Sequence, residues 1–547
     1  MRLESPRSLS PLNEDAFVMQ TSATHWTHEL RAAAGFLGGL QVFLKRRLDL
    51  AGASRILELQ LAAREQTFTQ VMQHAVFENP ASPYRRLLEW AGITLADVLS
   101  MLSQVGLDAT LENLYGAGVH VTLQEFKGRY PIVRSGLELN VRAEDFDNPL
   151  TTRQYEAQTG GSTSSPRRIL VDLNLLEHES AYHAIFYAAA GASNRALGIW
   201  QPAPPGAVGI KTALMHAKLG RPVAMWFSQS NLRGSTLKHA MFTRAMVATA
   251  RICGARIRVP EYTPAADAGR VAAWLAQQCA AGSPAILVTP ASGGVRTCRA
   301  ALDNGLDIAG TIFVLGGEPY TEAKAAVMAQ CGSLGFCHYA MVECGLIGLA
   351  CQAGDSPDDV HLVSDKIATI QRDKKVGPGT VVGSLFHTTL LPATPKVMLN
   401  VESGDYAVRV DRDCGCGALP SAFRSHLHTI RSYEKLTSEG MNFLGDDLLA
   451  LVEQVLPARF GGHPTDYQFV EREKDGLPKV SLVVSPEVGQ IDDDRAVQAV
   501  LDFLRNRGVG EQLMVDLWAQ SRTLTVVRRA PLVTSGGKIL PLHTLSE

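Results

Sequence analysis

The feature of this chain that most restricts its fold is an alternation of short β-branched runs and helical stretches between residues 150 and 430. The stretches LKHAMFTRAMVATARICG and DAGRVAAWLAQQCAA have apolar residues at helical spacing. They lie between short runs that each suit one buried strand: VGIKTALM, PVAMWF, ARIRVP, PAILVTP and GTIFVLGG. Strands that alternate with helices are typical of parallel α/β layers. The sequence therefore predicts an α/β fold for this region.

The segments on either side have different patterns. Residues 1–28 are rich in Ser and Pro and are expected to be loosely ordered, whereas residues 29–115 have the apolar spacing of helices. Residues 116–432 would form the α/β core, so that 29–432 make one large domain that begins with its own helical segment. Residues 433–547 would form a small α+β domain. Its predicted helices are GDDLLALVEQVLPARF and DRAVQAVLDFLRNRG, and its predicted strands are DYQFVERE, PKVSLVVSP and TLTVVRRAPLV.

The composition argues against several classes of protein. The 52 Lys and Arg residues nearly balance the 54 Asp and Glu residues, so no basic excess would attract nucleic acid or an anionic membrane. The first residues lack the apolar core of a signal peptide, and the longest apolar runs, such as Ala188–Ala192, are far too short to span a bilayer. The nine cysteines are then expected to be reduced or metal-bound. We therefore expect a cytoplasmic protein without nucleic acid or a membrane as partner.

The first candidate site is the loop from Thr159 to Arg168, with the sequence TGGSTSSPRR. Small residues leave backbone N–H groups accessible to an anion, and the hydroxyls and an arginine add donors. This chemistry suits a phosphate, although the loop lacks the GK[ST] ending of a Walker loop. A flexible Ser/Gly linker would have a similar composition. The residues expected to contact the anion are Thr159, Gly160, Gly161, Ser162, Thr163, Ser164 and Arg167.

Two further motifs follow strand patterns of the α/β region. Gly316-Gly317-Glu318 comes after TIFV, and open α/β sheets bind ligands at such turns at the carboxyl ends of strands. An ordinary strand-to-helix turn would have the same pattern. In HYAMVE, the ring of Tyr339 could stack on a base and the carboxylate of Glu343 could hold Mg²⁺. These two residues are four apart and could instead share one face of a helix.

Two more motifs lie towards the C-terminus. Asp405, in ESGDY, is interpreted as an acid on a glycine turn that suits the two hydroxyls of a ribose, although any β-turn can have this pattern. Lys538, in VTSGGKI, lies on a flexible glycine loop and can approach a phosphate or a carboxylate. An exposed lysine on a surface loop is the alternative.

The order of these motifs resembles that of the acyl-adenylate-forming superfamily. A small-residue loop with Pro-Arg, then GGE, Y-x-x-x-E, GD and a C-terminal GK succeed one another, and the resemblance covers about residues 120–547. Within the superfamily, the chain resembles the phenylacetate–CoA ligase-like branch. The resemblance implies a large α/β adenylation domain followed by a small, mobile C-terminal α+β domain.

The resemblance also implies roles for single residues. ATP would be bound by Thr159, Gly160, Gly161, Ser162, Thr163, Ser164, Gly316, Gly317, Glu318, Tyr339, Asp405 and Arg431, the last two on the ribose. Glu343 would hold Mg²⁺, and Arg167 and Lys538 would act in catalysis beside it. Four positions depart from the superfamily's pattern: Ser165 replaces a Gly, Arg167 a Lys, Ala340 a Gly, and Val342 a Thr that contacts the nucleotide phosphate.

The implied reaction has two steps. A carboxylate attacks the α-phosphate of ATP and releases pyrophosphate, and the acyl group then passes to a thiol after the small domain has rotated. The thiol could belong to coenzyme A, to the phosphopantetheine of a carrier protein or to a protein cysteine, and the enzyme could be a homodimer. Three alternatives stay open: an amine acceptor in an amide-forming ligase, a different acid such as nitrite in a diazotising ligase, or a degenerate nucleotide-binding protein.

A second candidate site lies among the cysteines. Cys414 and Cys416 form a C-x-C on a glycine turn, and Cys351 and His361 lie upstream. Two thiolates from one turn, with one Cys and one His from an earlier segment, make a tetrahedral zinc set. The phenylacetate–CoA ligase-like branch often carries a Cys…His pair and a Cys-rich turn at these places. A Cys₃His set with no open position would be structural, and buried free thiols are the alternative.

Four histidines are weaker candidates. His178 and His183 lie on a predicted helix, and one of them could face the acyl pocket, although a core or surface role is the simpler interpretation. His426 and His428 lie at a predicted strand and are interpreted as structural or solvent-facing.

Overall fold

The computed structural model describes residues 35–151, 154–159, 167–203, 208–229, 237–377, 380–417, 419–433, 437–438, 441–442, 445–474, 477–505, 524–534 and 537–545. The segment 1–28, which we expected to be loosely ordered, lies outside these residues.

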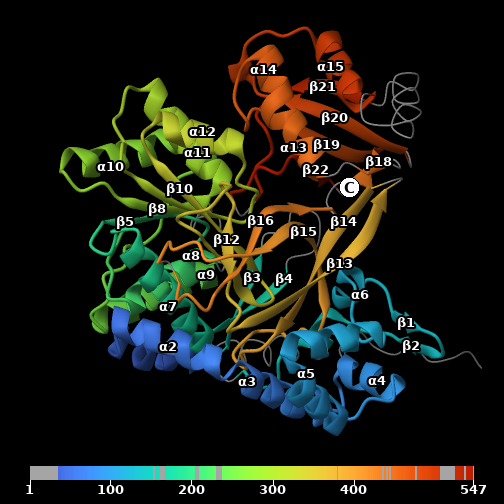
Figure 1. Cartoon of the computed structure of the whole chain (residues 1–547). Coiled ribbons are helices and arrows are strands. Elements are labelled where there is room, and N and C mark those ends of the chain that lie inside the picture. Colours follow the sequence, from blue (N-terminus) through green and yellow to red (C-terminus); the bar gives the residue numbers. More distant parts are fainter. Residues whose placement is uncertain are drawn as a thin grey trace, which may run out of the picture.

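One large sheet forms the centre of the molecule (Figure 1). In the described part of the chain it has twelve strands in the order β13-β14-β15-β16-β12-β11-β10-β9-β8-β5-β6-β7. These strands are β5 (Leu197–Trp200), β6 (Val223–Ser228), β7 (Glu261–Tyr262), β8 (Ile286–Pro290), β9 (Ile312–Gly316), β10 (Leu334–Met341), β11 (Gly345–Ala350), β12 (Val360–Leu362), β13 (Ile367–Gly377), β14 (Thr380–Thr389), β15 (Val401–Asp411) and β16 (Ser425–Ser432).

The strands β5 to β10 form the parallel part of this sheet, and a helix joins each to the next. The helices of this part are α7 (Leu173–Ala189), α8 (Val208–Lys218), α9 (Leu237–Ile252), α10 (Ala268–Ala280), α11 (Ala291–Asp303) and α12 (Glu322–Gln330). From β5, the strands β6 and β7 extend the sheet towards one edge. The next strand, β8, lies on the other side of β5, and β9 and β10 extend the sheet in the opposite direction. The strand order therefore reverses between β5 and β8, and open α/β sheets bind ligands at the carboxyl ends of strands at such a point.

Two helical layers cover the two faces of the parallel part (Figure 1). Residues of α7, α8 and α9 share one hydrophobic core, and residues of α10, α11 and α12 share another. Successive residues of a strand point to the two cores alternately. In β8, Ile286 and Val288 pack in the first core and Leu287 packs in the second. This double coverage explains why the strand sequences are apolar throughout rather than alternating. The predicted α/β class is confirmed.

The antiparallel strands β11 to β16 pack against the later helices of the N-terminal segment, which are α3 (Arg64–Gln70), the π-helix η2 (Val71–Phe77), α4 (Pro83–Trp90) and α5 (Leu95–Gly116). The earlier helices of that segment, one that includes residues 35–45 and α2 (Leu50–Ala62), share the core of α7, α8 and α9 instead. A capping box of Thr94 and Asp97 begins α5, whose buried Leu111 shares a core with Ile370 of β13 and Leu385 of β14. Among the described helices none alone is long and apolar enough to cross a bilayer, while the bent pair α4 and α5 meets that test by length and composition together.

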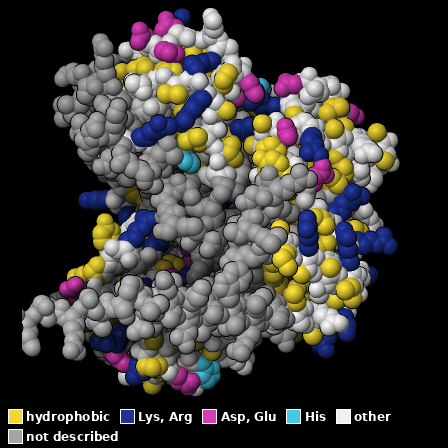
Figure 2. Space-filling view, turned by 180° about the vertical axis from the view of Figure 1, so that it is seen from behind, with side chains coloured by type: hydrophobic (Ala, Val, Ile, Leu, Met, Phe, Trp, Pro, Cys, Tyr) yellow, Lys and Arg dark blue, Asp and Glu magenta, His cyan; other side chains and the backbone are white. Residues whose placement is uncertain are grey.

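Short elements connect these parts. They are α6 (Leu123–Phe126), β1 (Ile132–Arg134), β2 (Leu137–Leu139), η3 (Ala143–Phe146), β3 (Gln154–Thr159), β4 (Arg167–Asp172), η4 (Ala265–Asp267), β17 (Thr437–Ser438) and β18 (Met441–Asn442). On the face opposite to that of Figure 1, Lys and Arg side chains occur at several separate places with hydrophobic and acidic side chains between them (Figure 2).

The C-terminal residues form a separate four-stranded sheet in the order β21-β20-β19-β22. Its elements are α13 (Gly445–Ala450), the π-helix η5 (Leu451–Val455), α14 (Leu456–Phe460), β19 (Tyr467–Lys474), β20 (Leu477–Val484), η6 (Pro486–Val488), α15 (Asp493–Arg505), β21 (Leu524–Arg528) and β22 (Leu542–Leu545). These elements share a hydrophobic core of their own. Among the described residues, three ion pairs join them to the large sheet's helices: Lys324 of α12 pairs with Glu453 at 2.7 Å, and Arg299 of α11 pairs with Asp466 at 2.8 Å and with Glu487 at 3.0 Å.

Two of the runs expected to be strands are different in the structure. The run 208–215 forms most of α8. This helix is covered by α7 and the sheet, so nearly all of its residues are buried and it has no polar face. Its sequence therefore lacks the apolar and polar spacing of an amphipathic helix. The run 255–260 contributes one isolated bridge, at Ile257, beside β6. The parallel strand β22, whose four residues follow a glycine loop, gave no distinct pattern in the sequence.

The buried ion pair between Lys324 and Glu453 predicts how the C-terminal unit is held. The side chains are 5% and 3% exposed, and Thr321 also donates a hydrogen bond to the Glu453 carboxylate. Removing one partner of a buried pair leaves the other charge uncompensated. We expect Glu453→Gln to lower the free energy of unfolding by about 3 kcal/mol and to speed hydrogen exchange in α12.

The exposed carboxylate of Glu487 supplies a matched control. Glu487 contacts Arg299 with a side chain that is 70% exposed. Glu487→Gln should change the free energy of unfolding by less than about 0.5 kcal/mol, measured by urea titration. Equal effects of the two variants would mean that the Lys324–Glu453 pair contributes no more than a surface contact.

Candidate functional site

The carboxyl ends of the parallel strands bring the Gly-Gly motif to the reversal of strand order. Gly316 ends β9, and Gly317 follows it with a φ of 75° and an exposed position. A Cβ atom at Gly317 would lie 2.5 Å from Nζ of Lys538. Glycine at this position therefore permits both the backbone conformation and the close approach of the lysine.

The loop that carries Lys538 is shaped by its own hydrogen bonds and by a second glycine. The N–H of Thr534 donates to the carbonyl of Lys538 at 2.8 Å, and the N–H of Lys538 donates to Oγ1 of Thr534 at 3.1 Å. Gly537 has a φ of 76°, and a Cβ there would lie 2.3 Å from Nε2 of Gln229, just beyond β6. The C-terminal loop therefore packs onto the carboxyl edge of the large sheet from β6 to β9.

Glu318 is a buried carboxylate that accepts hydrogen bonds from two segments. Its oxygens accept from the N–H of Ser292 at 2.6 Å, from Oγ of Ser292 at 2.9 Å and from the N–H of Ile539 at 2.7 Å. Burial raises the pKa of this carboxyl group, and the cation of Lys324 opposes that rise. Glu318 thus ties the first turn of α11 to the residue after Lys538. The sequence assigned Glu318 to the nucleotide, whereas its oxygens are bonded to the protein.

Tyr339 and Asp405 meet although 66 residues separate them. The hydroxyl of Tyr339, on β10, donates to Oδ2 of Asp405, on β15, at 2.8 Å. Burial, and after it the charge of Asp405, raises the pKa of the Tyr339 hydroxyl. Asp405 lies inside the continuous strand β15, next to Gly404 with a φ of 80°, and not on a turn as the sequence suggested. Glu343 lies in the turn after β10, so the alternative of a shared helix face is wrong.

Arg431 lies on β16 beside these residues, opposite Tyr406 in the strand register. Its guanidinium pairs with Asp358 at 2.6 Å. The carboxylate of Asp358 also accepts from the N–H groups of Thr429 at 2.9 Å and Ile430 at 3.0 Å, so it fixes the backbone before Arg431 as well as the side chain. The sequence gave no signal for Asp358, because its role depends on a contact across 73 residues.

Most of the phosphate-loop prediction lies outside the described residues, since Gly160, Gly161, Ser162, Thr163 and Ser164 are not among them. The flanking backbone is described. Thr159 ends β3, Arg167 begins β4, and the two residues pair directly in an antiparallel hairpin. The predicted loop is therefore the connection of a hairpin.

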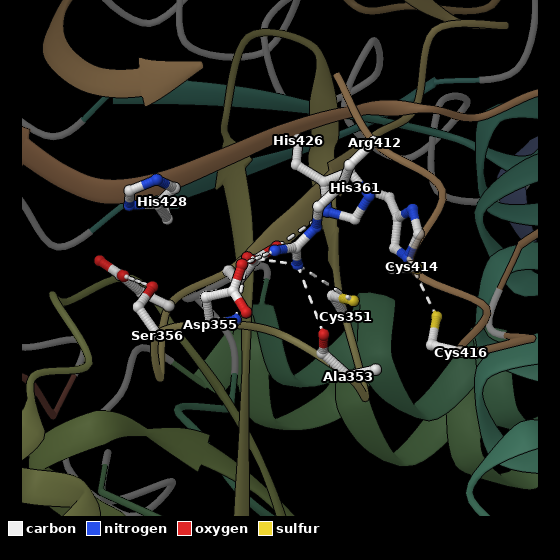
Figure 3. Close-up of polar contacts among 12 residues, drawn as sticks. Cys351, Ala353, Asp355, Ser356, His361, Arg412, Cys414, Cys416, His426 and His428 are labelled. Carbon is white, nitrogen blue, oxygen red and sulfur yellow. Dashed lines mark hydrogen bonds and ion pairs between the residues drawn. The ribbon is translucent and has the colours of Figure 1, made fainter. Parts of the chain in front are cut away.

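The four residues predicted to bind zinc come together (Figure 3). Cys351 follows β11, His361 lies on β12, and Cys414 and Cys416 lie between β15 and β16; their ligand atoms are all within 4.8 Å of one another. Nε2 of His361 is 3.1 Å from Sγ of Cys416 and 3.6 Å from Sγ of Cys414. Around a tetrahedral zinc ion, nitrogen and sulfur ligands are about 3.5 Å apart. The donor set and its spacing therefore fit zinc.

Neighbouring groups orient this cluster. Nδ1 of His361 is 3.1 Å from the carbonyl oxygen of Phe423, and because a carbonyl only accepts, Nδ1 carries the proton and Nε2 presents its lone pair to the sulfurs. Arg412 lies 3.9 Å from Sγ of Cys351 (Figure 3). It also lies 2.7 Å from Asp359. The hydrogen bond from Cys416 and burial raise the pKa of the Cys351 thiol, and a bound cation would reverse this by favouring the thiolate.

The histidines considered in the sequence belong mainly to the core. His178 contacts Asp365 at 2.8 Å, and His426 contacts Asp359 at 2.8 Å. His183 is buried, and its ring lies 5.4 Å from that of His338 and 5.6 Å from that of His216. Burial lowers the pKa of His183 to about 4.

The fold and the site define the class of protein. It is an α/β protein whose candidate site lies at a reversal of strand order, where a loop of a small C-terminal unit packs onto the edge of the sheet. No family model and no curated protein matches the sequence.

Solved structures do match the chain. A 2-hydroxyisobutyryl-CoA ligase in the postadenylation state matches with a TM-score of 0.47 and 15% identity, over 92% of this chain and 91% of that one. An open conformation of that ligase, with 2-HIB-AMP and CoA, matches with a TM-score of 0.43 and 16% identity over 86% and 92%. The O-succinylbenzoate coenzyme A synthetase of Bacillus subtilis, with ATP and magnesium, matches with a TM-score of 0.37 and 14% identity over 71% and 68%. These are ligases of the kind that the motif order resembles; at such identities and TM-scores, the activity has to rest on this chain's own residues.

The buried imidazole of His183 predicts a pH dependence of stability. An unfolded histidine takes up a proton near pH 6.5, and the folded one does so only near pH 4, so stability falls as the pH drops through this interval. We expect the free energy of unfolding to lose about 2 kcal/mol between about pH 7.5 and about pH 5 because of this group alone.

Urea unfolding of His183→Leu at the two pH values measures this contribution. The variant should lose about 2 kcal/mol less on acidification than the wild type. His74→Gln, at a surface histidine whose side chain is 46% exposed, serves as the control and should keep the wild-type difference. An unchanged pH dependence in His183→Leu would contradict the proposed origin of the effect.

Proposed function

We propose that this chain is an AMP-forming ligase that activates a carboxylic acid with ATP and passes the acyl group to a thiol. One observation carries the proposal: the Lys538 amine of the C-terminal loop lies against Gly317, at the reversal of strand order. The C-terminal loop is held there by the hydrogen bond from the N–H of Ile539 to Glu318 and by a backbone hydrogen bond between Thr534 and Lys538. A cation so positioned suits a reaction whose transition state accumulates negative charge on phosphate oxygens.

The nucleotide would lie along the same edge. Asp405 and Arg431, which occupy paired strands, would bind the ribose, and the ring of Tyr339 would stack on the base. Gly316 and Gly317 have no side chains and would let the base approach the backbone. The hairpin connection between Thr159 and Arg167 would bind the β- and γ-phosphates through backbone N–H groups and hydroxyls.

In the first step a carboxylate oxygen of the acid would attack the α-phosphorus of ATP. The bond from that phosphorus to the bridging oxygen breaks, and pyrophosphate leaves with the electron pair, so no protein nucleophile is needed. Lys538 and Arg167 would stabilise the charge on the phosphates. Glu343, in the turn after β10, would hold Mg²⁺, which neutralises phosphate charge when bound.

In the second step a thiol sulfur would attack the acyl carbonyl, and AMP would leave. The thiol proton passes to solvent, and the acceptor would be coenzyme A or the phosphopantetheine of a carrier protein. For the C-terminal unit to rotate between the steps, the contacts of Glu453 with Lys324 and of Ile539 with Glu318 would have to break. Both are contacts of a few side chains, which suits a movable unit.

Lys538→Ala tests the first step. We expect the rate of pyrophosphate release with ATP, Mg²⁺ and a panel of acids to fall about 100- to 1000-fold, because one charge that stabilises the transition state is lost. Gly317→Ala should reproduce much of this defect while leaving the lysine in the chain, since its Cβ would occupy the position of the amine. Lys45→Ala, at an exposed lysine, is the control and should keep the wild-type rate.

Two outcomes would contradict the assignment. Full activity of Lys538→Ala would remove Lys538 from the reaction. The absence of pyrophosphate release by the wild type with every acid would favour the alternative of a nucleotide-binding protein without adenylation activity.

We also propose that Cys351, His361, Cys414 and Cys416 bind a structural zinc ion. The support is their spacing and the orientation of His361 by the Phe423 carbonyl. Four protein ligands leave no open position, so the ion would take no part in the reaction. It would connect the β15–β16 turn to the β11–β12 pair.

Elemental analysis tests the zinc proposal. We expect about one zinc ion per chain, a loss of most of it in Cys416→Ser, and a lower thermal midpoint after treatment with a chelator. Cys253→Ser, at a cysteine that does not belong to this cluster, should retain the metal. Less than about a tenth of an equivalent in the purified wild type would rule the site out.

A further inference from the structure

Two cysteines that belong to neither candidate site lie on neighbouring helices of the large sheet. Cys298 is fully buried in α11, and Cys331 is the partly exposed residue at the C-cap of α12. Cys298 is a member of the hydrophobic core of α10, α11 and α12, and Cys331 packs against that core. They are 33 residues apart in the chain, so the packing of the two helices brings them together.

The thiol of Cys331 contacts Cys298 directly. Its Sγ lies 3.4 Å from the carbonyl oxygen of Cys298, to which the thiol donates a hydrogen bond. The two thiol groups are also hydrogen-bonded to each other. Because the sulfurs are already in contact, rotation of the side chains with a small backbone shift can bring them to the bonding distance of about 2.05 Å.

The backbone at Cys331 has the freedom for such a shift. The helix α12 ends at Gln330, and the N–H of Cys331 donates to the carbonyl of Met328 at 3.1 Å, which is the bond of a tightened last turn. Gly332 follows with a φ of 63° and turns the chain away from the helix axis. Cys331 can therefore move without interrupting the regular hydrogen bonds of α12.

The two thiols differ in reactivity. The hydrogen bond from Cys298 lowers the pKa of the Cys331 thiol, and burial opposes this. The same contact, and after it burial, raises the pKa of the Cys298 thiol. Since the thiolate is the reactive form of cysteine, the partly exposed Cys331 is the thiol that would react first with an oxidant in solution. Cys298 lies behind it, in the position of a resolving thiol.

We infer that Cys298 and Cys331 are a modification site, a pair of thiols that a hydroperoxide converts into a reversible disulfide. Sγ of Cys331 attacks one peroxide oxygen, the O–O bond breaks, and the leaving oxygen takes up a proton, so that Cys331 becomes a sulfenic acid. Sγ of Cys298 then attacks the sulfur of Cys331. The S–O bond breaks, and the hydroxide that leaves takes the thiol proton of Cys298 and forms water. The two thiols lose two electrons, which the peroxide accepts.

The disulfide would join the two helices that hold the C-terminal unit. Arg299, next to Cys298 in α11, pairs with Asp466, and Lys324 of α12 pairs with Glu453. A covalent bond between α11 and α12 would fix the spacing of these two anchoring cations. The redox state of the pair would therefore act on the surface on which the C-terminal unit docks.

Peptide mapping of the full chain tests the inference. The reduced protein is treated with hydrogen peroxide, the remaining thiols are alkylated, and the tryptic peptides are analysed by mass spectrometry without reduction. We expect a cross-link between the peptides of Cys298 and Cys331 in most chains, with a mass about 2 Da below the sum of the two peptides. Dithiothreitol should remove the cross-link by thiol–disulfide exchange.

Variants identify the role of each thiol. In Cys298→Ser the hydroxyl can still donate to the sulfur of Cys331 but cannot form a disulfide. We therefore expect Cys331 to remain a sulfenic acid, which dimedone should label at least about 10-fold faster than it labels Cys279. Cys331→Ser should abolish the cross-link in Cys298.

Cys279 is the matched control. It is also partly exposed, but its Sγ contacts the carbonyl oxygen of Ala309 at 3.4 Å, and burial raises the pKa of its thiol. Cys279→Ser should keep the cross-link between Cys298 and Cys331 at the wild-type level. If Cys298→Ser does not fold, the peptide map of the wild type decides.

The outcomes do not depend on the proposed ligase activity, because the assay measures thiols and needs neither ATP nor an acid. Cys331 oxidised to a sulfinic acid with Cys298 still free would show that the two sulfurs do not meet, and would overturn the inference. Cross-links of either residue to other cysteines, in place of the expected one, would overturn it as well.

Discussion

The parallel pairing of β5 with β8 is the constraint on which the rest of the structure depends. These strands are neighbours in the sheet although two strands and three helices separate them in the chain. Because the chain leaves β5 and β8 towards opposite faces of the sheet, α8 covers one face and α11 covers the other. Open α/β sheets bind ligands at the carboxyl ends of strands at such a point. Gly317 and Lys538 lie at this edge of the sheet.

Buried carboxylates hold the surroundings of that position in place. Glu318 binds both the start of α11 and the residue after Lys538, Asp358 binds Arg431 and the backbone before it, and Glu179 binds Lys366. Each of these acids is satisfied by several donors, which is the condition under which a buried charge is tolerated. The hairpin of β15 and β16 connects the two candidate sites, because Asp405 of β15 and Arg431 of β16 lie towards one end and the cysteine turn lies at the other.

Much of the fold could be predicted from local patterns, and the failures have one cause. The alternation of apolar runs with helical stretches predicted the parallel layers correctly, because a buried strand can be recognised from its own apolar residues. The run 208–215 was interpreted as a strand because a helix covered on all sides has no polar face. Gly404 suggested a turn before Asp405, whereas it lies within a strand whose pairing is irregular.

The sequence by itself determined the class of the fold, the order of the motifs and the four residues that meet at the cysteine cluster. These follow from residue types and spacing, which are local properties. Only the tertiary structure decided that Tyr339 bonds Asp405 and that Glu318 is bonded to the protein. Such contacts join residues tens to hundreds of positions apart, and whether a charge is partnered depends on which segments the sheet brings together, which no local pattern encodes.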